Sequence, residues 1–276
     1  MAQIVAAMAS VHVPLLTSAP HMLDQAAWDK VHQGFNSLRE TLTASGADTL
    51  VVISDEHFNA LDPRRYPTFG VVTAETGVGP VENWLGMPCN SIKVNFVPEL
   101  AEAVLREGAQ QGFDLTRISE AGLEHGFLTV LHFLTPKWDL SYLWLIQNCV
   151  LPPLPSVKRC YEFGRMVGDA IRKWGGSRRV AILGTGGLSH AVGTPDMGKI
   201  DPEFDKKFLK RLCANSPTLR KITDAELDAV GNGTHEIRNW VAVAGAVEGA
   251  KGEVIMYEPM MAVGFGMMRF QLPEAA

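Results

Sequence analysis

The chain has 276 residues, of which 46% are hydrophobic and 20% are charged, and its formal net charge is −5. This is the composition of an ordinary globular protein that can bury a large core without disulfide or metal staples. A mildly acidic chain lacks the clustered lysine and arginine that nucleic acids require, so we expect no nucleic-acid partner. Anionic small molecules stay open as substrates, because one local arginine or lysine can bind a carboxylate.

Strands and helices are predicted in alternation from the N-terminus onward. Short apolar runs, most of them rich in valine and isoleucine, predict strands at Gln3–Ser10, Thr49–Ser54, Thr68–Thr73, Leu140–Gln147, Arg179–Leu183, Glu253–Tyr257 and Ala262–Phe270. Helical patterns lie between them at Gln25–Ala44, Val97–Gly108, Phe127–Leu134, Val157–Trp174, Pro202–Cys213, Asp224–Val230 and His235–Glu248. Asp201 before Pro202, and Ser156 before Val157, are typical helix N-caps.

This alternation predicts an α/β fold, in which helices flank both faces of a largely buried central β-sheet. Only Glu258–Met261 separates the last two strands, so that pair is expected to be antiparallel and the sheet mixed. No repeat, low-complexity tract or Pro/Gly/Ser-rich linker divides the chain. We therefore expect one domain over residues 1–276.

Membrane insertion and disulfide bonding are not expected. No stretch approaches the roughly 20 apolar residues of a membrane-spanning helix, and the N-terminal segment MAQIVAAMASVHVP has no basic residue. The four cysteines are far apart and form no CxxC pair, which predicts free, buried or half-buried thiols in a reducing cytoplasm (Cys89, Cys149, Cys160 and Cys213).

Four histidines lie at the ends of predicted elements. His12 and His57 follow the first two predicted strands, and His190 follows the fifth in Gly-Thr-Gly-Gly-Leu-Ser-His. His125 lies just before the helix predicted from Phe127. A single histidine at a strand end is more often a hydrogen-bonded structural residue. Neighbouring parallel strands would bring the His12 and His57 loops together at one sheet edge, so we expect the four histidines to form one site.

The other histidines and the glycine-rich run receive structural interpretations. His21 and His32 are expected on the surface, and His132 is expected in packing. The Gly-Thr-Gly-Gly run has neither the GxGxxG pattern nor the Gly-Lys-Ser/Thr ending of a phosphate loop, so we exclude nucleotide binding.

Three carboxylates lie close to these histidines or start a helix. Asp55 and Glu56 flank His57 and are predicted either to bind a metal or to orient the imidazole ring. Glu236 falls in the first turn of the helix predicted from His235, where the helix dipole alone also favours an acid. His235 should point about a quarter turn away from Glu236.

Seven segments match one known family in order from residue 10 to residue 245. They are Ser10–Pro14 (SVHVP), Ser54–Asn59 (SDEHFN), Glu124–Gly126 (EHG), Leu151–Cys160 (LPPLPSVKRC), Gly184–His190 (GTGGLSH), Gly198–Leu212 (GKIDPEFDKKFLKRL) and Thr234–Gly245 (THEIRNWVAVAG). On these segments the chain resembles the class III extradiol ring-cleavage dioxygenases, and among them the catalytic β subunits of protocatechuate 4,5-dioxygenases. GTGGLSH and DPEFD are the most specific blocks.

The resemblance implies a single catalytic domain with non-haem Fe(II) held by His12, His57 and Glu236. It also implies that His190 and His125 line the pocket, His190 as the base that removes a hydroxyl proton and His125 as a proton donor or oxygen-stabilising residue. Two imidazoles and one carboxylate leave positions open for a catechol and O₂. The implied reaction is extradiol (meta) cleavage of a substituted catechol such as protocatechuate or gallate, which gives a muconic semialdehyde-type product containing both atoms of O₂.

Several alternatives stay open at this point. Another substituted catechol or a 2-aminophenol fits the same site. The same three ligands in a zinc-dependent hydrolase would activate water, although HExxH is absent. A non-catalytic relative should have lost some of the five site residues, and all five are present. The protocatechuate enzyme closes its pocket with a small lid subunit, so we expect such a partner or a homo-oligomer here.

Overall fold

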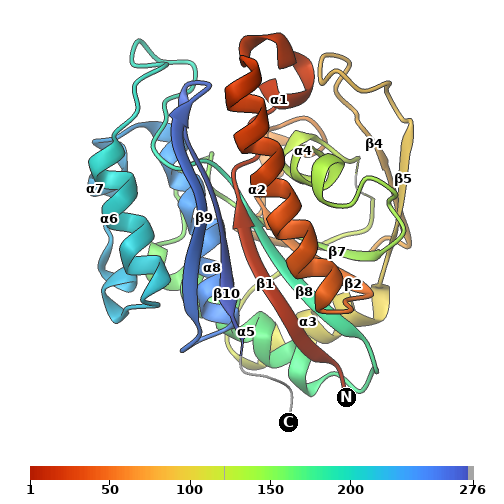
Figure 1. Ribbon diagram of the computed structural model, residues 1–276. Helices are drawn as coiled ribbons and strands as arrows, with labels where there is room; N and C mark the ends of the chain where they lie inside the picture. Colours follow the sequence, from red (N-terminus) through yellow and green to blue (C-terminus); the bar gives the residue numbers. More distant parts are fainter. Residues whose placement is uncertain (121, 273–276) are drawn as a thin grey trace.

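The computed structural model describes residues 1–120 and 122–272, and over these residues one ten-stranded sheet organises the fold (Figure 1). The strands are β1 (Gln3–Ser10), β2 (Thr49–Ser54), β3 (Phe69–Val72), β4 (Thr76–Gly79), β5 (Ile92–Phe96), β6 (Thr116–Ile118), β7 (Ser141–Gln147), β8 (Arg179–Thr185), β9 (Lys251–Met260) and β10 (Val263–Gln271). Their order is β4-β5-β7-β2-β8-β1-β10-β9, and β3 pairs with β7 and β6.

Helices cover both faces of this sheet, which confirms the predicted fold class. They are α1 (Leu15–Ser18), α2 (Gln25–Ala44), α3 (Pro98–Gln110), α4 (His125–Leu134), α5 (Val157–Lys173), α6 (Pro202–Cys213), α7 (Asp224–Asp228) and α8 (Ile237–Ala246). Short 3-10 helices are η1 (Pro20–Met22), η2 (Pro63–Arg65), η3 (Pro217–Lys221) and η4 (Asn232–Glu236). One apolar core lies between the sheet and α2 with α4, and the other between the sheet and α3, α5 and α8 (Figure 1).

The centre of the sheet is parallel, and this places the site. β7, β2, β8 and β1 run in the same direction, so their carboxyl ends meet at one edge. β9 and β10 form the predicted antiparallel hairpin beside β1, which makes the sheet mixed. The expectation that β1 and β2 are neighbours is wrong, because β8 lies between them. β8 is buried after Arg179 along its whole length, as an inner parallel strand covered on both faces should be.

Helix α8 is held against α5 by a backbone contact that only glycine permits. A Cβ on Gly164 would lie 1.7 Å from the carbonyl oxygen of Ala242, and one on Gly245 would lie 2.1 Å from that of Tyr161. All residues of α8 are buried. The predicted start of this helix was too early, because Glu236 is the last residue of η4 and directly precedes α8. This close packing fixes the position of α8, and therefore that of Glu236, which directly precedes it.

The structure also bears on the predictions about membranes and cysteines. None of the described helices is long and apolar enough to cross a membrane. The four cysteines are free; Cys149 and Cys160 are buried and Cys213 is half-buried. Cys89 is exposed, so the prediction of burial is wrong for that residue, which lies in the loop before β5.

Candidate active site

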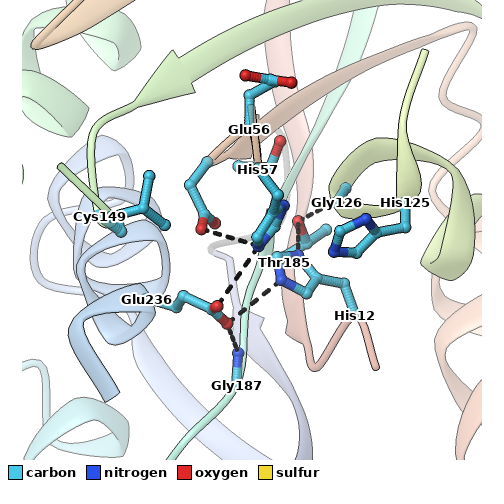
Figure 2. A network of polar contacts seen from close by, with 12 residues as sticks. His12, Glu56, His57, His125, Gly126, Cys149, Thr185, Gly187 and Glu236 are labelled. Carbon is cyan, nitrogen blue, oxygen red and sulfur yellow. Dashed lines mark hydrogen bonds and ion pairs between the residues drawn. The ribbon is translucent and has the colours of Figure 1, made fainter. Parts of the chain in front are cut away.

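His12, His57 and Glu236 converge at the carboxyl edge of the parallel strands (Figure 2). His12 Nε2 lies 3.2 Å from Glu236 Oε2, and His57 Nε2 lies 3.6 Å from Glu236 Oε1. Although β8 separates β1 from β2, the two imidazole centroids are only 5.0 Å apart. The loops after the two strands bend over the end of β8, so the predicted meeting of the side chains occurs across that strand.

Hydrogen bonds on the far side of each imidazole orient both rings. Thr185 Oγ1 donates to the Gly126 carbonyl oxygen (2.7 Å), so it accepts from His12 Nδ1 (3.2 Å). His57 Nδ1 donates to Glu124 Oε2 (3.0 Å). With protons on both Nδ1 atoms, the Nε2 lone pairs point toward the Glu236 carboxylate. This is the tautomer that a metal-binding histidine requires.

Asp55 joins this group, whereas Glu56 does not. Asp55 Oδ1 accepts from Asn239 Nδ2 (2.9 Å), and its other oxygen, Oδ2, is buried without a hydrogen-bond partner 3.2 Å from His57 Nε2. One ligand atom from each of His12, Asp55, His57 and Glu236 lies within 4.8 Å of the others. Glu56 points away from them (Figure 2) and accepts from the backbone N–H groups of the following turn.

The carboxylates and imidazoles shift one another's protonation. Burial would raise the pKa of Glu236, but His12 and His190 outweigh it and hold that pKa well below its usual range. Burial would lower the pKa of His57, but Asp55 and Glu124 raise it well above its usual value. The pKa of His12 is raised in the same way, against burial, chiefly by Glu236. The group is a dense set of charges that a divalent cation would complete.

His190 lies beside Glu236 and is held in place by glycines. Its Nδ1 donates to the carbonyl oxygen of Leu188 (2.8 Å), and its Nε2 lies 3.5 Å from Glu236 Oε1. A Cβ on Gly233 would lie 2.1 Å from that Nε2, so only glycine leaves room for the ring. Gly187, whose N–H donates to Glu236 Oε2, packs against the other side of the ring.

His125 lies on the opposite side of the group, at the start of α4. Its ring centroid is 4.0 Å from that of His57 and 5.7 Å from that of His12. His125 Nδ1 donates to Glu82 Oε1 (2.5 Å), which also accepts from Asn59 Nδ2 (2.9 Å). Sequence reasoning missed Glu82, because nothing in the loop between β4 and β5 marks a contact with a residue 43 positions away.

The remaining histidines lie outside this group. His21 and His32 are exposed, as predicted. His132 is also exposed, with its ring edge on Phe133, so its predicted role in core packing is wrong; it lies on the face of α4 that meets solvent. His235 turns away from Glu236, as predicted, and contacts Asp228 and Arg238 instead.

A cavity of about 620 Å³ opens beside the group and is lined in part by His57 and Glu236. Loops that follow β2, β7 and β8 form its walls, together with η4. Its volume is within the range of small-molecule pockets, about 300–1,000 Å³. One buried imidazole, one half-buried imidazole and two buried carboxylates, next to such a cavity at the edge of an α/β sheet, are typical of a mononuclear metal enzyme.

The comparison with known families identifies the enzyme class. Residues 6–268 match the family described as the catalytic LigB subunit of aromatic ring-opening dioxygenase, and the chain belongs to this family. It is thus a class III extradiol dioxygenase, as the sequence motifs predicted.

Similar proteins come from enteric bacteria. The chain is 25% identical to a 2,3-dihydroxyphenylpropionate/2,3-dihydroxicinnamic acid 1,2-dioxygenase of Klebsiella pneumoniae (strain 342), over 89% of this chain and 92% of the relative. The enzyme of the same name in Escherichia coli (strain K12) is 26% identical over 88% and 92%. A solved structure, the uncharacterized protein JW3007 from Escherichia coli K12, has the same fold, with a TM-score of 0.64 and 15% identity over 97% of this chain and 100% of that chain.

Proposed function

We propose that this protein is an Fe(II)-dependent dioxygenase that opens the ring of a substituted catechol beside its hydroxyl pair. His12, His57 and Glu236 are assigned as the metal ligands, and His190 and His125 as the residues that move protons. The observation that carries the proposal is the meeting of these five side chains, from five separate segments of the chain, next to a cavity that His57 and Glu236 line.

The donor set fits a divalent metal. Both imidazoles present Nε2 toward the same carboxylate, and Asp55 Oδ2 is buried without a hydrogen-bond donor. A buried carboxylate oxygen without a partner is costly, and a cation is the partner that would satisfy it. Two imidazoles with oxygen ligands suit Fe(II) and leave positions for substrate. When bound, Fe(II) would supply positions for the catechol and O₂ and a route for electrons from the catecholate to O₂.

His190 is suited to take the hydroxyl proton of the catechol. Its Nδ1 is committed to the Leu188 carbonyl, so a proton from substrate can be accepted only at Nε2, the atom that faces Glu236. Burial would lower the pKa of His190, but Glu236 raises it above the ordinary imidazole value, which favours acceptance of a proton. The glycines on both sides of the ring keep Nε2 at one position.

His125 is suited to donate a proton on the other side of the proposed metal ligands. Glu82 accepts from its Nδ1, which leaves Nε2 to hold or release a proton. Glu124 Oε2 lies 3.1 Å from the same Nδ1, and both carboxylates are buried. The proton can pass from His125 to the oxygen of the opening ring, and the product is a muconic semialdehyde-type acid that contains both atoms of O₂.

The test is anaerobic reconstitution with Fe(II), followed by O₂ uptake and visible spectra with catechols, protocatechuate, gallate and 2-aminophenol. His12→Ala and Glu236→Ala should lose both the bound metal and the uptake, whereas Glu107→Gln, a carboxylate on α3 outside the site, should retain both. Absence of uptake with every compound, together with zinc-dependent ester or amide hydrolysis, would replace the dioxygenase with a hydrolase on the same ligands.

The assembly is part of the same proposal. We assign residues 1–276 to a single catalytic domain that works in the cytoplasm, with either a small lid subunit or a second copy of this chain over the cavity. Light scattering of the purified chain distinguishes the two, because a homo-oligomer forms without any added partner and a lid subunit must be supplied.

A further inference from the structure

Apart from the proposed metal ligand His57, the charged side chains that line the cavity are carboxylates. Its lining includes the carboxylates of Asp224, Asp228 and Glu236, and none of the described residues that line it is a lysine or an arginine. Glu236 is already assigned to the metal. Because Asp224 is paired with Arg238, a negatively charged substituent on the catechol ring would face the carboxylate of Asp228, with no lysine or arginine in the described lining to oppose it.

Arg238, which contacts Asp224 and His235 of the cavity lining, is committed to the protein. It is completely buried, and all three of its side-chain nitrogens are engaged. Nε donates to the carbonyl oxygen of Pro155 (2.8 Å), Nη2 to Asp224 Oδ1 (2.6 Å) and Nη1 to His235 Nδ1 (2.5 Å). A substrate carboxylate could reach this guanidinium only by displacing His235 and Asp224.

His235 lines the cavity but offers no charge to an anion. Because its Nδ1 accepts from Arg238, its proton is on Nε2, which donates to Asp228 Oδ1 (2.7 Å). The imidazole is therefore neutral, and both of its nitrogens are paired.

The rest of the wall is apolar. Phe58 after β2, Val150, Pro152 and Leu154 after β7, and Val192 after β8 line it. Phe58 and Val192 are large apolar residues that are 43% and 54% exposed, as expected of side chains that wait for an apolar partner. The cavity exceeds what an unsubstituted catechol fills, since about 620 Å³ corresponds to roughly 20 water volumes.

We propose that the ring substituent of the substrate is apolar and uncharged, and that the cavity discriminates against catechols that carry a carboxylate. This inference rests on the proposed ring-cleaving function and specifies its substrate class. Protocatechuate and gallate, which both carry a carboxylate on the ring, then rank below alkyl, aryl or ester-substituted catechols. Asp228 and Val192 are the residues that set this preference, because they line the cavity and are not among the proposed metal ligands.

The experiment is anaerobic calorimetric titration of the Fe(II)-loaded protein with 3-(2,3-dihydroxyphenyl)propionate and with its methyl ester. The two ligands differ in charge, and the ethylene spacer insulates the ring hydroxyls from the substituent. We expect the ester to bind about tenfold more tightly, the effect of one unfavourable charge contact in a partly desolvated site. Equal binding, or tighter binding of the acid, overturns the inference.

Two matched variants locate the effect. Val192→Lys places an ammonium at the cavity and should reduce or reverse the preference for the ester, whereas Met197→Lys adds the same charge on the same loop outside the cavity lining and should leave it within about twofold of the parent. Asp228→Asn keeps the acceptor oxygen for His235 and should also weaken the preference. Identical behaviour of the two lysine variants would mean that net charge, and not the cavity, is responsible.

The failure of this inference differs from the failure of the proposed function. If both ligands bind and are cleaved but the acid binds at least as tightly, the dioxygenase stands and the proposed substituent is wrong. If the protein binds Fe(II) but neither ligand, the ring-cleaving function is overturned and the inference with it.

Discussion

Glu124 controls which tautomer His57 adopts, and Glu124→Gln should therefore weaken metal binding. In the parent protein Glu124 Oε1 accepts from the Gly126 N–H (2.7 Å), while Oε2 accepts from His57 Nδ1 (3.0 Å). In the glutamine variant the Gly126 N–H must still donate to an oxygen, so the side-chain amide oxygen of the new glutamine takes that position. The side-chain NH₂ group then faces His57 Nδ1. Two donors then oppose each other, and His57 relieves the conflict by moving its proton to Nε2, the atom that should bind the metal.

The size of the effect follows from the role of Glu124 in orienting His57. Partners that orient a metal-binding histidine typically contribute 10–100-fold to affinity, or about 1.4–2.7 kcal/mol. Glu124 is completely buried, and its pKa is lowered to about 2, against burial, by His125 and His57. A loss near the upper end is therefore expected, because the variant also removes a charge that both imidazoles use.

The assay is competitive titration of Fe(II) and Zn(II) against a chelator, with circular dichroism to confirm folding. Glu107→Gln is the matched control, since Glu107 is also a buried carboxylate but pairs with Lys173 far from the site. Affinity that stays within about twofold of the parent in Glu124→Gln would refute the reasoning about the tautomer.

Four further outcomes are expected. Gly233→Ala should displace the His190 ring and lower kcat by at least about 100-fold, with metal affinity unchanged in the same titration. Gly164→Ala should lower the free energy of unfolding in urea by about 3 kcal/mol or more, because α8 must move, whereas Gly175→Ala, which meets open space, should be neutral. Metal affinity should increase from about pH 6 to pH 8. Burial lowers the pKa of His12 and His57, but the neighbouring carboxylates raise it by more, so at low pH these imidazoles hold protons that the metal must displace. The raised pKa values of His12 and His57 also stabilise the metal-free fold below about pH 6.5. The melting temperature of the metal-free protein should therefore fall as the pH rises through these pKa values, whereas that of the metal-loaded protein should not.

Much of the fold was accessible from local patterns. Strands β1 and β2 begin and end at the predicted residues, because each is a continuous apolar run followed by polar residues. Helix α6 was also predicted at both ends, from Asp201 and Pro202 at its start. Strands β4 and β5 were missed: Thr76–Gly79 contains two glycines, and both strands are exposed at alternate positions, so neither has the pattern of a buried run.

The site shows the same division between local and long-range information. His12, His57, His125, His190 and Glu236 were named because each lies in a specific motif, and the structure brings all five together. The position of β8 between β1 and β2 was not predictable, because strand pairing depends on contacts between residues more than a hundred positions apart.

The residues that orient these side chains through hydrogen bonds could not be predicted from the sequence either. The role of Glu82 depends on a contact between two loops, and that of Thr185 on the end of a strand whose neighbours were not known. Glu124 lies in a matched motif, but only the structure shows that it holds His57 and His125 at once. Sequence motifs name the proposed metal ligands, whereas tertiary contacts determine how these side chains are oriented.

The measurement that tests the central claim most directly is cleavage of a catechol under ¹⁸O₂ by the Fe(II)-loaded protein. The product is reduced immediately, so that the aldehyde oxygen cannot exchange with water, and its mass is then recorded. The account predicts a ring-opened product that contains both labelled oxygen atoms, and no such product from Glu236→Ala. A ring-opened product with one labelled atom or none, or a labelled product that Glu236→Ala forms equally well, would contradict it.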